Sequence, residues 1–159
     1  MVIGPSGAGK SVFSRKLRDK TGLPVYHLDN IWWKEDKTHI TREEFVEKLA
    51  VIVAKDEWII DGDYSRTYEL RVKAADTVFF LDYPLEVCLA GAEGRIGTKR
   101  EDIPWVEDKF DPDFKEWIID WRKNKMPRIT ALFEKYKDEK NIIIFKTRLE
   151  ADDFLDNLK

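Results

Sequence analysis

The stretch GPSGAGKS, residues 4–11, matches the pattern G-x-x-x-x-G-K-[ST] of a phosphate-binding loop. It follows a short apolar run at residues 1–3 and precedes a helix-like segment at 10–20, which Gly22 closes. A loop with this pattern binds phosphate when a strand precedes it and a helix follows it, and the sequence of this chain predicts both. The stretch therefore predicts a nucleoside triphosphate site. The first strand is either unusually short or preceded by further residues in the natural chain.

Each residue type in this loop has a chemical role. Glycines let successive backbone N–H groups point at phosphate oxygens, and the following helix adds the positive end of its dipole. We expect Lys10 to reach the terminal phosphates of ATP as a catalytic residue, and the hydroxyl of Ser11 to bind Mg²⁺. The expected nucleotide-binding residues are Gly4, Pro5, Ser6, Gly7, Ala8, Gly9, Lys10 and Ser11.

The composition is that of a folded protein with one domain spanning residues 1–159. Apolar runs stop at four or five residues, so we expect neither a membrane span nor a signal peptide. The single cysteine, Cys88, excludes an internal disulfide and suits a reducing cytoplasm, where we expect the protein to act. The net charge of −3 argues against DNA as a partner. The oligomeric state stays open.

Strand-like and helix-like segments alternate along the chain. This alternation predicts an α/β three-layer sandwich, with a five-stranded parallel sheet, right-handed crossovers and helices on both faces. The later strands are expected at residues 24–28, 58–61, 78–82 and 142–145. Helices are expected at 41–54, where Thr41 and Glu44 form a capping box, at 85–95, at 114–122, after Pro127, and at 149–158.

Three carboxylates follow apolar strands: Asp29, Asp61 and Asp82. Ligands of parallel sheets bind outside the carboxyl ends of the strands, so we expect all three beside the phosphate loop. Asp61 is the candidate that accepts hydrogen bonds from Mg²⁺-bound water and Ser11; its alternative role is to form a turn before Gly62. Asp82 fits a similar role or a structural turn equally well.

The phosphoryl acceptor is expected on the side of residues 29–56. There Asp29 is the catalytic candidate that orients an acceptor hydroxyl or takes its proton; its alternative role is to cap the next segment. Arg66, five residues past the end of its strand, and Trp33 are the further acceptor-binding candidates. For Trp33, as for Trp32 and Trp105, packing against helices is the competing use. His27 is expected in or beside the core.

A lid-like insertion is expected at residues 96–113, which are charged and interrupted by one glycine and two prolines. Arg95 and Arg100 begin this segment as candidate catalytic cations that close over the triphosphate. A solvated basic cluster is the alternative, above all for Lys99. From the far side of the lid, either Arg122 or Arg128 returns to the site, and Arg122 is our catalytic candidate.

Several of these motifs together resemble the adenylate kinase-like P-loop proteins. The resemblance lies in the loop, in WIIDG (58–62), in FFLDYP (79–84) and in RIGTKR (95–100). PVYHLD (24–29), WIIDG and KREDIPW (99–105) further resemble the bacterial DNA topology modulation proteins. The resemblance implies a P-loop NTPase of the nucleoside or small-molecule kinase type with a short lid. Adenylate kinases have Phe-Pro-Arg after Asp-Gly, whereas DYSR (63–66) follows here, which argues against AMP as acceptor.

Two functions from different classes follow. The leading hypothesis is a phosphotransferase that uses ATP and Mg²⁺ and moves the γ-phosphoryl group to a small-molecule acceptor of unknown identity. The alternative, which the name of the resembled group implies, is a nucleic-acid-associated ATP-binding protein that influences DNA topology. A guanine-specific switch is excluded, since no Asn-Lys-x-Asp signature is present.

Overall fold

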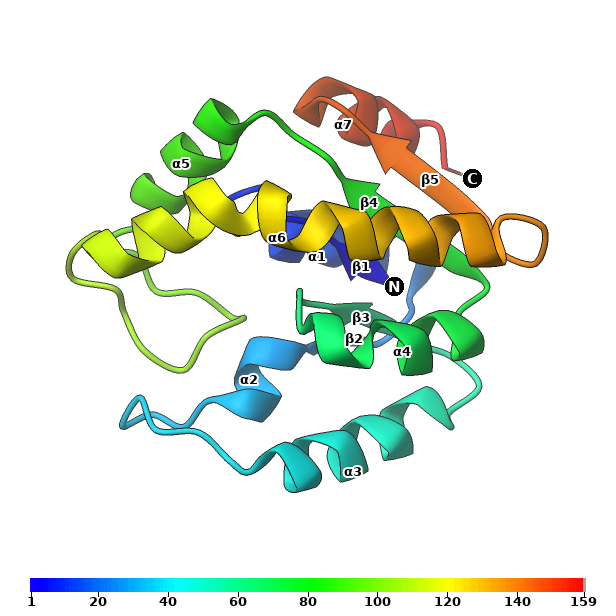
Figure 1. Ribbon diagram of the computed structural model, residues 1–159, viewed down its shortest axis with the longest axis horizontal. Coiled ribbons are helices and arrows are strands. Elements are labelled where there is room, and N and C mark those ends of the chain that lie inside the picture. Colours follow the sequence, from blue (N-terminus) through cyan, green and yellow to red (C-terminus); the bar gives the residue numbers. More distant parts are fainter. Residues whose placement is uncertain (159) are drawn as a thin grey trace.

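The central sheet has five parallel strands in the order β2-β3-β1-β4-β5, as seen in the computed structural model, which describes residues 1–158 (Figure 1). The predicted all-parallel sheet is therefore confirmed. The strands are β1 (Val2–Ile3), β2 (Val25–His27), β3 (Ile59–Asp61), β4 (Thr77–Leu81) and β5 (Asn141–Phe145).

Helices cover both faces of this sheet, with α6 crossing in front and α1 lying behind in Figure 1. Successive side chains of β4 explain the layers: Phe79 packs against α1 and α7, while Phe80 packs against α4 and α6. The helices are α1 (Lys10–Thr21), α2 (Leu28–Trp32), α3 (Arg42–Val53), α4 (Tyr68–Ala74), α5 (Leu85–Glu93), α6 (Pro112–Tyr136) and α7 (Arg148–Asp156), with a 3₁₀ turn η1 (Ser65–Thr67).

The predicted helix ends of α1 and α3 are confirmed. Gly22 closes α1 with a positive φ of 75°, and its N–H donates to the carbonyl of Arg18. At the start of α3, the Thr41 hydroxyl accepts from the N–H of Glu44, and the Glu44 carboxylate accepts from the N–H of Thr41. Both ends are fixed by local sequence.

Strand register brings the phosphate loop and the candidate carboxylates to one edge of the sheet. Val2 and His27 both pair with Asp61, the last residue of β3, and Ile3 pairs with Phe80. The strands therefore end nearly level, and the loop after β1 leaves between its two neighbours. This is the edge where parallel sheets bind ligands.

Two predicted elements are wrong in their bounds. Asp29 does not end a strand: β2 stops at His27, because its only neighbour, β3, stops at the paired Asp61, and Asp29 lies in α2. The chain also does not break at Pro127. One helix, α6, runs through that proline, because apolar residues on both sides of it, such as Trp121 and Ile129, are buried in the same cluster. This burial offsets the missing hydrogen bond.

Within residues 1–158, no helix is both long enough and apolar enough to cross a bilayer.

Candidate active site

The phosphate loop lies in close contact with helix α5. Gly7 has a positive φ of 80°, and a Cβ at this position would lie 1.8 Å from the carbonyl oxygen of Cys88. On the helix side, a Cβ on Gly91 would lie 2.1 Å from the carbonyl oxygen of Gly7. Because Gly7 and Gly91 have no side chains, the backbones of the phosphate loop and α5 can pack directly against each other.

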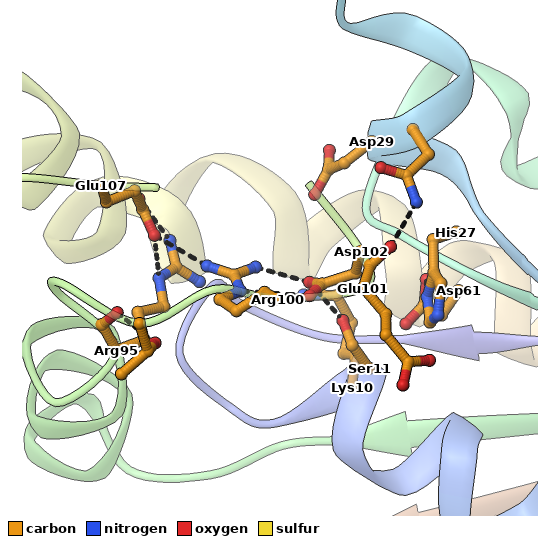
Figure 2. Close-up of polar contacts among 12 residues, drawn as sticks. Lys10, Ser11, His27, Asp29, Asp61, Arg95, Arg100, Glu101, Asp102 and Glu107 are labelled. Carbon is orange, nitrogen blue, oxygen red and sulfur yellow. Dashed lines mark hydrogen bonds and ion pairs between the residues drawn. The ribbon is translucent and has the colours of Figure 1, made fainter. Parts of the chain in front are cut away.

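Lys10 and Ser11 open helix α1 at the mouth of the loop. The Lys10 ammonium donates to the carbonyl of Pro5 at 3.0 Å, so the side chain folds back over the loop. The Ser11 hydroxyl donates to Oδ2 of Asp102 at 2.7 Å (Figure 2). Asp102 belongs to the loop between α5 and α6, so this segment reaches the phosphate loop in the structure.

The two arginines expected over the triphosphate are paired with carboxylates of their own segment. Arg100 donates to Oδ1 of Asp102 at 3.1 Å and to Glu107 at 2.7 Å, and Arg95 lies 2.8 Å from Glu107 (Figure 2). Burial raises the pKa of Asp102, but the hydrogen bonds and charge of Arg100 outweigh it and hold this pKa far below its usual range. Any phosphate that binds these arginines must compete with the two carboxylates.

Asp61 is buried beside this cluster and pairs with His27. Its Oδ1 lies 2.9 Å from Nδ1 of His27, and its Oδ2 has no hydrogen-bond partner within residues 1–158. Burial lowers the pKa of His27, yet the hydrogen bond and charge of Asp61 outweigh burial and raise it. The expectation that His27 is buried is correct.

These residues fit a Mg²⁺ ion whose remaining ligands are phosphate oxygens and water. Among the described residues, no three His, Cys, Asp or Glu side chains are grouped closely enough to hold a metal alone. Mg²⁺ in nucleotide sites normally needs only one or two protein ligands, besides phosphate oxygens and water. The unpartnered Oδ2 of Asp61 and the hydroxyl of Ser11 are suitable oxygen donors.

Asp29 faces the phosphate loop from α2. Its carboxylate accepts from the Tyr64 hydroxyl at 2.7 Å. Burial raises the pKa of Asp29, and the carboxylates of Asp61 and Asp102 raise it further, whereas Tyr64 and Lys10 lower it. In Figure 2 the Asp29 side chain extends from α2 on the side of Asp102 and the other polar residues drawn. The charge of Lys10 acts on this carboxylate, which is therefore on the side of Lys10, where a proton acceptor for phosphoryl transfer is needed.

Tyr64 is held in place by a buried arginine. Arg71 of α4 is fully buried and donates to the carbonyls of Gly62 and Asp63 at 3.0 and 2.6 Å. Burial lowers the pKa of Arg71 to about 10. Tyr64 has a left-handed φ of 33°, and Arg71 fixes the turn that includes it.

Two further predicted residues, Arg122 and Asp82, pair with each other at the carboxyl end of β4. Arg122 is exposed and pairs with the buried Asp82 at 2.6 Å, and Lys146 also contacts Asp82. Arg128 instead lines a groove with Tyr68 on the opposite side of α6 from these contacts. The carboxylate of Asp82 is therefore already neutralised by cations from α6 and from the residue after β5.

The acceptor candidates differ in their surroundings. Trp33 is half-buried and packs edge-on against Trp105, with ring centres 5.6 Å apart. Trp32 packs against Phe45 and stacks on His39. Arg66 is exposed and forms no hydrogen bond or ion pair within the described chain, 1–158.

Sequence reasoning missed four residues of this site: Tyr64, Gly91, Asp102 and Glu107. For Asp102 a signal was available, because it follows Arg100 by two residues in a segment already expected to close. For Gly91 the signal was a glycine in the middle of a predicted helix, which usually has a packing reason.

The sequence of a phosphate-binding loop lies between the first strand and first helix of a parallel sheet in the order 2-3-1-4-5, with helices on both faces, which defines a three-layer α/β fold. No family model matches the chain. Over 93 residues it is 29% identical to an adenylate kinase of Thermotoga neapolitana; this covers 57% of the chain and 41% of the relative. The chain therefore matches less than half of that enzyme's length.

Solved structures agree on the fold. The chain is similar to a shikimate kinase from Acinetobacter baumannii in complex with shikimate, with a TM-score of 0.60, 16% identity and coverage of 98% and 87% of the two chains. It is also similar to an unliganded sugar kinase from Janibacter sp. HTCC2649, with a TM-score of 0.52, 17% identity and coverage of 98% and 88% of the two chains. A deoxyadenosine kinase from M. mycoides with bound dCTP has a TM-score of 0.50 and 12% identity, with coverage of 98% of this chain and 95% of that kinase. At these identities the likeness shows the fold alone.

Proposed function

We propose that the protein is an ATP-dependent phosphotransferase that moves the γ-phosphoryl group of ATP to a hydroxyl group of a small molecule. The observation that carries this proposal is the position of Asp29. A carboxylate with a raised pKa faces Lys10 at the mouth of a phosphate loop. A nucleotide-binding protein without transfer activity has no need for a proton acceptor at that position.

The transfer step balances with the residues present. The acceptor oxygen attacks the γ-phosphorus, the bond to the β–γ bridging oxygen breaks, and ADP leaves. The acceptor proton passes to the carboxylate of Asp29, which Tyr64 orients at 2.7 Å. Lys10 balances charge on the β- and γ-phosphates, and backbone N–H groups of residues 4–11 hold them.

Mg²⁺ would be held by Ser11 and, through water, by Asp61. When bound, it neutralises phosphate charge and helps align the transferred group. In this proposal Arg95 exchanges Glu107 for phosphate oxygens when residues 96–113 close as a lid, and Arg100 contacts phosphate while it stays paired with Asp102. Positioning and charge stabilisation supply most of the rate enhancement in phosphoryl transfer.

For the acceptor side, we propose residues 29–56 together with Arg66. Arg66 is exposed and follows Tyr64, which donates to Asp29, by two residues. A guanidinium there suits an acceptor with an anionic group, and Trp33 would cover an apolar or planar part of it. Arg122 stays a catalytic candidate, because its pairing with Asp82 keeps a cation near the carboxyl end of β4.

A screen of ATP consumption tests this function. Purified protein with ATP and Mg²⁺ is offered nucleosides, nucleotides, sugars and hydroxy acids, and ADP release is measured together with the mass of each acceptor. We expect ADP release that depends on one acceptor class and is lost in Lys10→Ala. Lys20→Ala, at the exposed end of the same helix, is the matched control. Undiminished turnover in folded Lys10→Ala protein would refute the proposal.

A further inference from the structure

The hydroxyl of Ser11 has one proton, and the structure shows where it goes. It donates to Oδ2 of Asp102 at 2.7 Å, although the two residues are 91 positions apart in the sequence. Asp61, the strand carboxylate expected to be linked with Ser11, instead pairs with His27 and has no hydrogen bond to Ser11 among the described residues. The residue that sets the direction of the Ser11 proton therefore comes from the loop between α5 and α6.

Asp102 is firmly held as an ionised acceptor. It is 4% exposed, and Arg100 donates to both of its carboxylate oxygens. Arg100 in turn is shared with Glu107, so it lies between two carboxylates. An acceptor that is buried, charged and fixed by a guanidinium gives a strong, directional hydrogen bond with the serine.

The backbone around Asp102 is also fastened to the other side of the site. The side chain of Asn30, on α2, donates to the carbonyl of Glu101 at 2.5 Å, and Trp105 packs edge-on against Trp33. The segment thus bridges the phosphate loop and the acceptor side (Figure 2). In the structure, the contact of Asp102 with Ser11 and this bridge are present together.

We propose that Asp102 is the positioning residue that orients the Ser11 hydroxyl toward Mg²⁺. A hydroxyl oxygen has two lone pairs and one proton. Once the proton points to Asp102, the lone pairs are free to face a cation. Closure of residues 96–113 and binding of the metal are then coupled, because the carboxylate that prepares Ser11 arrives with that segment. This inference rests on the proposed use of ATP and Mg²⁺.

Binding of ATP, measured by calorimetry with Mg²⁺ and again with excess EDTA, tests the coupling without any activity assay. Removing the acceptor in Asp102→Ala should raise the Mg²⁺ concentration for half-maximal stimulation of ATP binding about tenfold, as for loss of a hydrogen bond to a charged group. In EDTA the same variant should bind ATP at least as tightly as wild type, because a negative charge near the phosphates has gone. Asp102→Asn retains an oxygen acceptor and should restore part of the Mg²⁺ response.

Glu101→Gln is the matched control, since it removes one negative charge from an exposed neighbour. It should leave the Mg²⁺ response unchanged, and thermal unfolding of all variants identifies any that fail to fold. An unchanged Mg²⁺ response in folded Asp102→Ala and Asp102→Asn would overturn the inference. So would tighter ATP binding by the same factor with and without Mg²⁺, which would make Asp102 only an occupant of the phosphate site. If wild type binds no ATP in either condition, the proposed function itself fails.

Discussion

Replacing Gly91 with alanine should damage both the stability of the protein and its affinity for ATP. Gly91 lies inside helix α5, where alanine normally stabilises by about 1 kcal/mol relative to glycine. Here, however, the added methyl carbon would lie 2.1 Å from the carbonyl oxygen of Gly7, well inside van der Waals contact. Neither atom belongs to a flexible side chain, so the helix or the phosphate loop must move.

Overpacking of this kind destabilises a protein by about 1–3 kcal/mol. The higher helix propensity of alanine offsets about 1 kcal/mol of this destabilisation. We therefore expect Gly91→Ala to lower the free energy of unfolding by up to about 2 kcal/mol. Displacement of Gly7 disturbs the N–H groups that hold phosphate, so ATP affinity should fall as well.

Urea unfolding and calorimetric ATP titration check both effects. The matched control is Gly94→Ala, at the end of the same helix, where the added carbon would meet only the carbonyl of Ala90, at 3.1 Å. The control should keep the ATP affinity of wild type. A Gly91→Ala protein that is more stable than wild type and binds ATP equally well would refute the steric reasoning.

Three further predictions concern the site. Lys10→Ala should abolish ATP turnover with an unfolding midpoint like that of Lys20→Ala, because the Lys10 ammonium donates, within residues 1–158, only to the carbonyl of Pro5 in the loop; a large loss of stability would contradict this. Tyr64→Phe removes a hydrogen bond that lowers the pKa of Asp29, so this pKa should rise and activity should be lost at a higher pH on acidification. An unshifted acid limb in the pH–rate profile argues against Asp29 as base. Residues 96–113 should gain hydrogen-exchange protection with an ATP analogue, and equal protection would contradict a closing lid.

The fold followed from the sequence because its signals are local. The phosphate loop is contiguous, the apolar strands are short and continuous, and the capping box of α3 lies within four residues. The continuity of α6 through Pro127 could not be read locally, because it depends on burial against a sheet whose strands lie elsewhere in the chain.

The site was predictable in its residue types and less so in its pairings. Lys10 and Ser11 open the helix after the first strand, and Asp29 lies in α2, the helix after the second strand, where the charge of Lys10 acts on its pKa. The partner of Ser11 was expected to be Asp61, but strand register pairs Asp61 with His27 instead. In the structure the hydroxyl of Ser11 donates its hydrogen bond to Asp102. Asp102 lies in a loop whose path depends on contacts on both sides of the site.

We propose that Asp29 takes the proton of the acceptor while the phosphate loop binds ATP independently of Asp29. The most direct test compares wild type with Asp29→Asn in two measurements on the same preparations: ATP affinity, and acceptor-dependent ADP release with the acceptor found by the screen. We predict that Asp29→Asn binds ATP as wild type does and loses transfer. Transfer at the wild-type rate by a folded Asp29→Asn protein would contradict the claim.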